Sequence, residues 1–449
     1  MNKLLETTQH IADLVWGWPF MILLAGTGLF LTVRLGGIQF RKLGLALYMA
    51  RPGAPKAVGA EGDISNFKAL MTALSATVGT GNIAGVATAI AIGGPGAMFW
   101  MWMMGLIGMA TKYSEAILAV HYREKNAQGE MCGGPMYYIS RGLGSNPISK
   151  VLAAMFAVFT IVAALIGIGC MIQSNTIADA LHATFELDRR ITAVALMVVT
   201  GAVLLGGIKS IGKVVAVFVP TMVVAYVGAA LVVLGLNASE VPAAFALIFR
   251  EAFQPTAATG GFVGSVVMLA VQMGVSRGLF SNESGLGSAP IAAAAASASH
   301  PAQQALISMT QTFIDTIVIC TITALVLIVT GAWNSGETGA RLTTMAFQRG
   351  FSGGDVVVTI ALLLFAWSTM LGWSYYGEKA LEYLFGSGPT MVFRVVFVIL
   401  IGVGAIAEAD LVWTIGDISN ALMAFPNLIA LLLLSPLIVK LTNEYFADK

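Results

Sequence analysis

The chain has 449 residues, of which 57% are hydrophobic and only 10% are charged, and its formal net charge is +1. Soluble domains carry roughly 25% charged residues, so this composition excludes an ordinary soluble protein and indicates one polytopic membrane domain over residues 1–449. The near-neutral charge gives no indication of a nucleic-acid partner. Cys132, Cys170 and Cys320 lie far apart, which argues against a disulfide framework or a zinc site.

The N-terminal segment, residues 1–13, contains acids and one lysine ahead of the first apolar run. It has neither a basic n-region nor a small-residue cleavage site, which a secretory signal peptide requires. We therefore expect no cleaved signal, and we expect the first apolar run to remain as a helix.

Apolar runs of about 20 residues are long enough to cross a bilayer as helices. The sequence predicts about eleven, and residues 209–213 are expected to separate the fifth from the sixth. Their ranges are 12–34, 64–92, 97–124, 150–175, 190–209, 213–236, 258–290, 302–331, 354–382, 391–407 and 411–440. The expected fold class is an all-α polytopic membrane protein.

Basic residues are more frequent at one set of predicted helix ends than at the other, 15 against 6. The richer set includes Arg41, Arg123, Lys213 and Lys440. Cytoplasmic loops carry the excess of Lys and Arg. We therefore expect the N-terminus outside and the C-terminus in the cytoplasm, as an odd number of crossings requires.

Two of the predicted helices contain glycine-rich stretches, at residues 75–85 and 272–287, each with the order Gly, Asn, Gly. Unpaired backbone groups inside a bilayer cost several kcal/mol each. A protein accepts a break there where the freed groups bind something, so both helices are predicted to be discontinuous.

The interrupted helices open two runs of five, residues 64–236 and 258–440. Because five is odd, the second run enters the membrane from the opposite side, which makes an inverted repeat. Helix 12–34 falls outside it. Paired Gly-interrupted helices at matching positions in two halves are typical of the binding site of a secondary transporter.

A broken helix exposes carbonyls, which attract Na⁺, and amides, which attract a carboxylate. An amino acid carries both signs and suits two such breaks. Gly79, Gly81 and Gly274 would let the backbone approach a ligand. The alternative is tight helix packing through small residues, which we expect for Gly105 and Gly108.

Helix 354–382 offers polar and aromatic side chains near its middle. The hydroxyls of Ser368 and Thr369 are hard donors suited to Na⁺, or else bond back to the helix. Trp367, Trp373 and Tyr376 are candidates to wall a small apolar side chain, or serve only in packing.

Charged residues within membrane helices are functional candidates. Arg277 and Glu283 are expected either to pair with each other or to gate or line the cytoplasmic path through the transporter. Asp315 is a candidate proton or ion carrier, or else bonds to a neighbouring break. Lys112 and Glu115 are three apart and are expected to pair across one turn. Gln173 is a candidate substrate contact.

The sequence contains no P-loop, which argues against ATP-driven transport. It also lacks the Gly-x-Ser-x-Gly and His-Glu-x-x-His patterns. No nucleophile–base pair, metal cluster or filter-like repeat is visible, which disfavours an enzyme and a channel. No organic cofactor and no particular oligomeric state are indicated.

Four motifs resemble those of the alanine/glycine:cation symporter family, also called sodium:alanine symporters. They are GGPGAMFWMW at 93–102, MATKYSE at 109–115, GEMCGGPMYY at 129–138 and RGLFSNESGLGSAP at 277–290. The resemblance runs from about residue 12 to 440. It implies a LeuT-like inverted-repeat fold and Na⁺- or sometimes H⁺-coupled uptake of alanine or glycine across the inner membrane.

The stretch from Val78 to Asn82 resembles the first-helix Val-Gly-x-Gly-Asn signature of LeuT-like sodium symporters. The resemblance implies a sodium site and a substrate site. Sodium would be bound by the carbonyls of Ser75 and Val78 and by Ala366 and Thr369, with Ser368 nearby. Met370 departs from the pattern, since a second hydroxyl is common after Thr369.

For the substrate, Thr80, Gly81 and Asn82 would face the carboxylate or a further ion. The backbone around Gln272, Met273, Gly274 and Ser276 would take the ammonium group. The expected function is therefore Na⁺-coupled symport of alanine or glycine by alternating access. The alternative is a proton-coupled symporter or an exchanger on the same fold, with Asp315 or Glu283 cycling protons.

Overall fold

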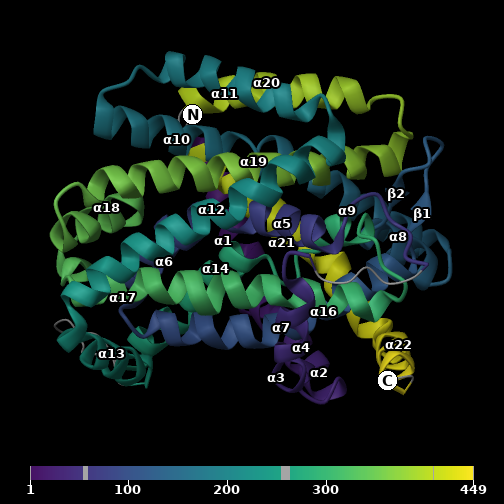
Figure 1. Cartoon of the computed structure of the whole chain (residues 1–449), viewed down its shortest axis with the longest axis horizontal. Helices are drawn as coiled ribbons and strands as arrows, with labels where there is room; N and C mark the ends of the chain where they lie inside the picture. The colour runs from purple at the N-terminus through teal and green to yellow at the C-terminus, as the bar shows by residue number, and fades with distance from the viewer. Residues whose placement is uncertain (1, 54–58, 254–262, 408, 448–449) are drawn as a thin grey trace.

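The computed structural model describes residues 2–53, 59–253, 263–407 and 409–447, and most of them are helical (Figure 1). The long helices run roughly parallel to the longest axis of the molecule, and the C-terminal helix projects at one corner. The part ahead of the predicted repeats contains α1 (Asn2–Val15), α2 (Trp18–Arg34), α3 (Ile38–Arg41) and α4 (Leu43–Ala50).

The first half contains the first broken helix and the helices that follow it. Its elements are α5 (Asn66–Thr77), the π-helix η1 (Gly81–Gly85), α6 (Val86–Gly93), α7 (Ala97–His121), β1 (Glu124–Lys125), β2 (Met131–Cys132), α8 (Pro135–Gly142), α9 (Pro147–Leu165), α10 (Met171–Phe185), α11 (Arg189–Leu204) and α12 (Gly207–Leu236). In the described part of the chain, β1 and β2 are the only strands. They pair antiparallel, with Glu124 opposite Cys132.

The second half repeats this order of long helices. Its elements are the 3₁₀-helix η2 (Ala238–Glu240), α13 (Val241–Phe253), α14 (Val263–Asn282), α15 (Ala289–Ala294), α16 (Pro301–Thr312), the π-helix η3 (Phe313–Cys320), α17 (Thr321–Val329), the 3₁₀-helix η4 (Ala332–Asn334), α18 (Gly339–Gly350), α19 (Gly354–Phe385), α20 (Thr390–Ile406), α21 (Ala409–Leu433) and α22 (Ser435–Ala447). The prediction of an all-α protein is confirmed.

Among the described ranges, five helical spans are long and apolar enough to cross a membrane. They are α9, α12, α16–α17, α19 and Val412–Leu433 of α21. The pair Asn66–Thr77 and Gly81–Gly93 passes the same test together and is bent by 52°. Each predicted apolar segment is helical over most of its length, and residues 258–262 of the seventh lie outside the described residues.

Side chains at the helix starts explain several of these boundaries. Ser65 accepts a hydrogen bond from the Lys68 amide (3.3 Å) ahead of α5, and Asn146 accepts one from Ser149 (2.9 Å) ahead of α9. Such caps satisfy amides that have no partner inside the helix. They fix where two helices of the first half begin.

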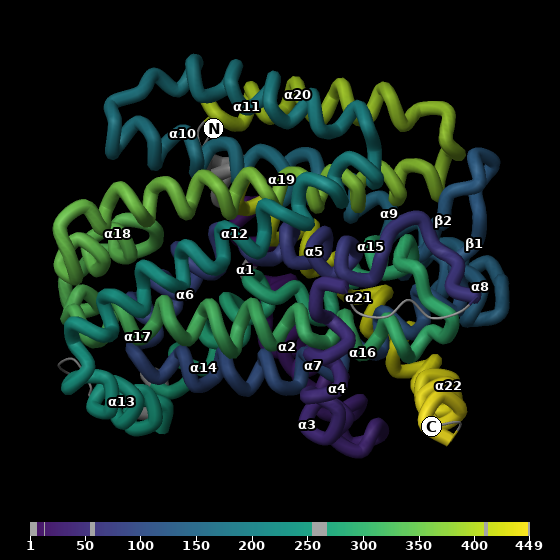
Figure 2. Tube along the Cα trace, viewed as in Figure 1, coloured from purple at the N-terminus to yellow at the C-terminus, as the bar shows by residue number. Residues whose placement is uncertain are grey.

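Corresponding helices of the two halves pack on each other. α7 and α16, the second long helices of the two halves, pack on each other. The third helices, α9 and α19, and the fourth helices, α11 and α20, do the same. Figure 2 shows α11 and α20 lying side by side along one edge of the molecule. The first helices also meet, since α14 packs on η1 and α6. This pairing brings the two broken helices together.

Three features differ from the expected organisation. The turn between α11 and α12 lies at Leu205–Gly206, where Gly207 has φ +57°, so residues 209–213 belong to α12. Segment 150–175 is interrupted at 166–170, between α9 and α10. The connecting helices α13 and α18 were not predicted. In these three places the polar residues of a short stretch predict the helix boundaries less well than glycine backbone geometry or the amphipathic pattern of the sequence.

Candidate functional site

The first break separates α5 from η1 and confirms the predicted interruption. α5 ends at Thr77, η1 begins at Gly81, and Asn82 closes the gap by accepting a hydrogen bond from the Gly79 amide (2.9 Å). π-Helical turns such as η1 occur frequently at functional sites. The break thus combines an irregular backbone with a buried polar side chain.

The second break lies between α14 and α15, at residues 283–288. Glu283, Gly285 and Gly287 have φ values of +54°, +97° and +81°. This left-handed region favours glycine, and Glu283 is unusual in adopting it. Three left-handed residues within five positions end α14 and redirect the chain into α15.

The backbone around Gln272, Met273, Gly274 and Ser276, which the family resemblance assigns to the ammonium group, does not lie at the second break. These residues lie in the regular part of α14, where backbone groups bond within the helix. Gly274 serves helix packing, because a methyl group there would lie 2.5 Å from the Ala97 carbonyl oxygen of α7. Gly105 and Gly108 likewise pack closely, against Thr316 and Ser284, as expected.

The two broken helices touch at Gly81. A methyl group at this position would lie 2.9 Å from Cα of Ser281 and 3.3 Å from the Phe280 ring. Beside it, Asn82 Nδ2 donates to Ser281 Oγ (3.0 Å). The first break therefore lies directly against the last turn of α14.

The predicted sodium residues of α5 and α19 come together at the first break. Ser368 Oγ donates to the Ser75 carbonyl oxygen (3.2 Å), and a methyl group at Gly79 would lie 2.5 Å from Thr369 Oγ1. Val78, which directly follows α5, and Ala366 of α19 are fully buried. The structure thus unites backbone and hydroxyl oxygens from both halves.

Both hydroxyls also bond back to their own helix. Ser368 Oγ lies 2.8 Å from the Phe365 carbonyl oxygen, so its one hydrogen is shared between this carbonyl and that of Ser75 (3.2 Å), and Thr369 Oγ1 donates to the Phe365 carbonyl (3.1 Å). A hydroxyl has one hydrogen and two lone pairs. Donation to the helix therefore leaves acceptor lone pairs for a cation, and the two alternatives considered for these residues are compatible.

A second polar cluster surrounds Asp315 in the π-helix η3. Its Oδ1 accepts from Asn82 Nδ2 (2.7 Å), and its Oδ2 accepts from Ser281 Oγ (2.8 Å) and Thr316 Oγ1 (2.9 Å). All four residues are at most 1% exposed. The expectation that Asp315 could bond to a neighbouring break is confirmed, and it bonds to both helices that carry one.

Several buried polar atoms near these elements have no hydrogen-bond partner within the described part of the chain. They include Thr80 Oγ1, Gln173 Oε1 and Tyr376 Oη. An unsatisfied buried polar group costs about 1–3 kcal/mol. A polar ligand that bonded to such atoms would recover this energy.

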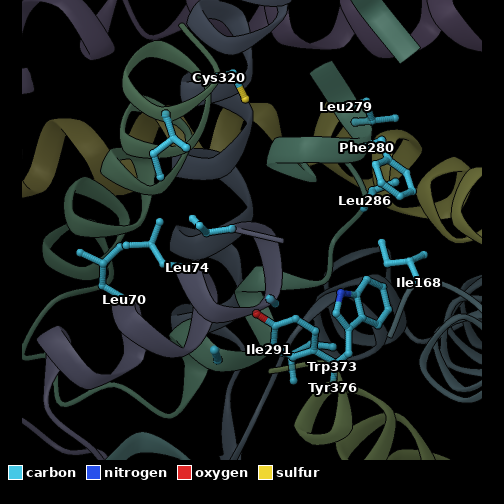
Figure 3. Close-up of a cluster of buried hydrophobic side chains, with 14 of the residues drawn as sticks. Leu70, Leu74, Ile168, Leu279, Phe280, Leu286, Ile291, Cys320, Trp373 and Tyr376 are labelled. Atoms are coloured by element: carbon cyan, nitrogen blue, oxygen red, sulfur yellow. The ribbon is translucent and has the colours of Figure 1, made fainter. Parts of the chain in front are cut away.

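The aromatic residues of α19 divide between two environments. Trp373 Nε1 donates to Glu283 Oε1 (2.9 Å), and its ring lies beside Tyr376 and Ile168, as Figure 3 shows. Trp367 instead donates to Thr200 Oγ1 of α11 (3.1 Å). Trp373 therefore belongs to the region of the breaks, and Trp367 belongs to the scaffold.

Gln272, Met273 and Ser276 line a cavity of about 140 Å³ together with Arg277. Phe280 lines the same cavity and packs on Gly81, so the cavity adjoins the first break. Residues of α1, α2 and α21 complete it: Gln9, Ala12, Trp16, Met21 and Asp417.

The amides of the second break are already bonded. Glu115 Oε1 accepts from the amides of Gly285 (3.0 Å) and Gly287 (3.1 Å) and from Asn427 Nδ2 (2.7 Å). Lys112 lies 4.0 Å from Glu115, which confirms the predicted pair. The second break consequently offers few free amides to a carboxylate.

Arg277 and Glu283 do not pair. Glu283 bonds to Trp373 and to Ser288 Oγ (2.5 Å), whereas Arg277 faces the cavity beside Phe280. Sequence reasoning missed Ser281, Ser288 and Asn427. The first two lie inside the quoted motif at 277–290, which was a signal for them, but no local pattern indicated Asn427.

The described residues contain no group of three or more His, Cys, Asp and Glu side chains that could hold a metal ion. The donors gathered at the first break are backbone and hydroxyl oxygens, which suit a hard monovalent cation. Two discontinuous helices at matching positions, with the first break lying against the last turn of the second broken helix, are typical of the binding site of a secondary transporter.

Comparison with known proteins identifies which group of transporters this is. The model of the sodium:alanine symporter family matches residues 1–449, and the chain belongs to this family. It is 52% identical over 440 residues to an uncharacterized transporter of Haemophilus influenzae, covering 97% of this chain and 95% of that one. It is 51% identical over 439 residues to the sodium/alanine symporter AgcS of Methanococcus maripaludis, covering 97% and 96%.

A solved structure supports the fold. The crystal structure of MhsT in complex with L-phenylalanine matches with a TM-score of 0.58 at 15% identity, covering 84% of this chain and 90% of that one. The predicted LeuT-like fold and the family resemblance are confirmed. The protein is a multi-pass membrane transporter.

Proposed function

We propose that this protein is a Na⁺-coupled symporter of a small neutral amino acid, alanine or glycine, that works by alternating access. The observation that carries the proposal is the junction of Ser75, Ser368 and Thr369, where oxygens of the two halves meet beside an unpaired Thr80 hydroxyl. The name of the relative AgcS, a sodium/alanine symporter, supports the same coupling ion and substrate.

Sodium would bind where α5 meets α19. The carbonyls of Ser75 and Val78 and the region of Ala366, Ser368 and Thr369 would supply the oxygens. A cation there would be shared by the two halves, so that its binding favours their closed arrangement. This is how a ligand shifts a conformational equilibrium, through unequal affinity for two states.

The amino acid would bind at the first break. Thr80, Gly81 and Asn82 would meet its carboxylate, since the first turn of a helix has amides without internal partners. Gln173 and Trp373 would line the side-chain and ammonium end. Gln272, Met273 and Ser276 would line the approach, through the cavity that adjoins Phe280.

Alternating access would move the two repeats, residues 64–236 and 258–440, against each other. We propose that the protein lies in the cell's inner membrane with its N-terminus outside and its C-terminus in the cytoplasm. The inward Na⁺ gradient would then drive accumulation without covalent chemistry.

Proton coupling, or exchange, on the same fold is the second candidate. The observation that favours it is the buried Asp315 carboxylate, which bonds to Asn82 of the first break and Ser281 of the second broken helix. A carboxylate in this position can carry a proton between two states of the breaks.

Uptake of labelled alanine into proteoliposomes, with and without a Na⁺ gradient at fixed pH, distinguishes the candidates. We expect accumulation with Na⁺ outside and none when K⁺ replaces it. Uptake that is independent of Na⁺ and follows the pH gradient would overturn the proposal in favour of the second candidate. Competition by a panel of L- and D-amino acids would then define the substrate.

A further inference from the structure

We propose that the hydrogen bond between Trp373 and Glu283 couples the ion site to the second break. Glu283 is then a positioning residue, because through it the orientation of α15 depends on the position of α19 against α5. The inference deepens the proposed function and rests on it, because it names the contact through which sodium binding would reach the second broken helix.

One short stretch of α19, from Ser368 to Trp373, contacts all three helix interruptions. Ser368 and Thr369 contact the end of α5. Gly372 packs there too, since a methyl group on it would lie 2.9 Å from Ser75 Oγ. Trp373 packs on the interruption between α9 and α10, where a methyl group at Gly169 would lie 2.7 Å from its Cβ.

α19 packs directly on α15, and it is also hydrogen-bonded to the third interruption, between α14 and α15, through the Glu283 carboxyl group. Glu283 Oε1 accepts from Trp373 Nε1 (2.9 Å), and Oε2 accepts from Ser288 Oγ (2.5 Å). Ser288 immediately precedes α15. One oxygen thus holds α19, and the other holds the start of the half-helix that follows the break.

All three residues of this chain of contacts are buried, at 1% exposure or less. Hydrogen bonds to charged groups are stronger than those between neutral groups, and more so away from water. The two bonds join α19 to the residue ahead of α15 through one buried carboxyl group, so a small shift of α19 would be carried to Ser288.

Trp373 is placed on α19 so that its indole would move when the proposed ion site changes. It lies four residues after Thr369 on a continuous helix, so the two side chains lie on the same face one turn apart. A change at Thr369 that reseats α19 against α5 therefore moves the indole by a comparable amount.

The element that would respond has a hinge. Glu283, Gly285 and Gly287 all have left-handed backbone, and α15 itself spans only Ala289–Ala294. A short half-helix after such a stretch can change its orientation at a few dihedral angles. Coupling between the ion site and the second break requires an element with two arrangements, whose equilibrium both sites shift. The half-helix α15 fits this requirement.

The test replaces the indole donor and leaves an aromatic ring. Trp373→Phe removes the hydrogen bond to Glu283. The matched control is Trp367→Phe, which removes an indole hydrogen bond from the same helix, but one that is made to Thr200 of the scaffold. Purified, reconstituted full-length protein of each kind is compared.

The first readout is amide hydrogen exchange of the peptide 279–290 in Na⁺ against K⁺, without substrate. We expect Na⁺ to slow exchange in the wild type and in Trp367→Phe, and to have no effect in Trp373→Phe. Slowing of the same size in Trp373→Phe would overturn the inference.

The second readout is the factor by which Na⁺ tightens alanine binding. Couplings between sites are typically about 5- to 150-fold. We expect such a factor in the wild type and in Trp367→Phe, and less than about twofold in Trp373→Phe. Because Trp373 is also proposed to line the substrate site, Trp373→Phe is expected to weaken alanine binding without Na⁺ as well. A role in structure or substrate lining alone would weaken binding equally at every Na⁺ concentration and leave the factor unchanged, so a wild-type factor in Trp373→Phe would overturn the inference.

Glu283→Gln provides the rescue, because its amide oxygen still accepts from Trp373 and its amide nitrogen can bond to Ser288. We expect it to retain most of the coupling that Glu283→Ala loses. Equal loss in both variants would contradict the hydrogen bond as the link. A wild type without any Na⁺ effect on alanine would instead defeat the proposed function, so the two failures are distinguishable.

Discussion

The two helix breaks look alike in the sequence but are satisfied in different ways. At the first, the Ser75 carbonyl lies 3.2 Å from the Ser368 hydroxyl, Thr369 Oγ1 lies beside Gly79, and Thr80 Oγ1 has no partner within the described residues. At the second, Glu115 holds the amides of Gly285 and Gly287. A glycine-rich break can therefore be either a ligand site or a hinge whose backbone amides are already hydrogen-bonded within the protein.

The difference has a simple physical origin. A carboxylate on α7 reaches the second break and occupies the amides that a ligand's carboxylate would otherwise use, as anions do at helix N-termini. At the first break the neighbouring groups are hydroxyls and carbonyls, which suit a cation. We therefore expect loss of Glu115, which holds the second break, to affect mainly stability, and substitutions at the first break to affect mainly transport.

The largest expected effect is on stability, at the second break. Glu115→Ala would leave the amides of Gly285 and Gly287 without an acceptor, Asn427 with one acceptor fewer, and Lys112 without its neighbouring carboxylate. Breaking a buried charge pair costs about 3–5 kcal/mol. We expect a large drop in the thermal unfolding midpoint of the purified protein, with a smaller drop for Glu115→Gln. An unchanged midpoint for Glu115→Ala would show that these amides do not need the carboxylate.

The next effect is on transport, where the broken helices touch. In Gly81→Ala the new methyl group would lie 2.9 Å from Ser281 Cα, a backbone atom that cannot move without shifting α14. Overpacking of this kind costs about 1–3 kcal/mol, so we expect uptake to fall by about tenfold or more. Gly85→Ala is the control, since its nearest neighbour is 3.9 Å away. Similar uptake in both variants would contradict close contact at Gly81.

Thr369→Ala removes one hydroxyl from the proposed sodium site. Loss of a hydrogen-bond partner for a charged group costs about 1.5–3 kcal/mol, so the Na⁺ concentration for half-maximal uptake should rise by about tenfold. Thr359→Ala, on the same helix but bonded to Thr184 (2.8 Å), should leave it unchanged. An unaltered Na⁺ dependence in Thr369→Ala would remove Thr369 from the site.

The smallest effect is expected in the cavity that adjoins the first break. Gln272→Ala and Ser276→Ala change only the lining of the approach, so the half-saturating alanine concentration should change by less than about twofold. A tenfold increase, measured in the same uptake assay, would show that these side chains hold the substrate after all.

The first break was predictable because its signal is local. Gly79, Gly81 and Asn82 lie within four positions of one another, and the polar pattern interrupts an otherwise apolar run. The partner residues Ser368 and Thr369 were found because neighbouring hydroxyls are conspicuous in an apolar helix. Their contact with Ser75 then followed from the family resemblance.

The second break lies at the end of the predicted stretch 272–287, and its exact position could not be predicted because its determinants are not local. Gly274 and Gly285 look equivalent in the sequence, but one packs on Ala97 of α7 and the other has left-handed backbone. The acceptor for its amides, Glu115, lies 170 residues away, and Asn427 lies 142 residues beyond Gly285. Contacts between residues so far apart in the chain produce no periodic pattern in a single sequence, so they could not be predicted from it.

The interruption between α9 and α10 was missed for a related reason. Gly167 and Gly169 lie in a run that reads as continuous apolar helix, and only their tight contacts with Gly416 and Trp373 explain the break. The amphipathic helices α13 and α18 lie on connections for which no element was predicted, because the search was for runs long enough to cross a membrane.

The central claim is that Na⁺ and an amino acid occupy the first break together, and reciprocity tests it most directly. Calorimetric titration of the purified transporter would give the Na⁺ affinity with and without alanine, and the alanine affinity with and without Na⁺. We predict that each ligand tightens the other by the same factor, as linkage requires, and that this factor is at least about fivefold. If neither affinity depends on the other ligand, the two do not share the site.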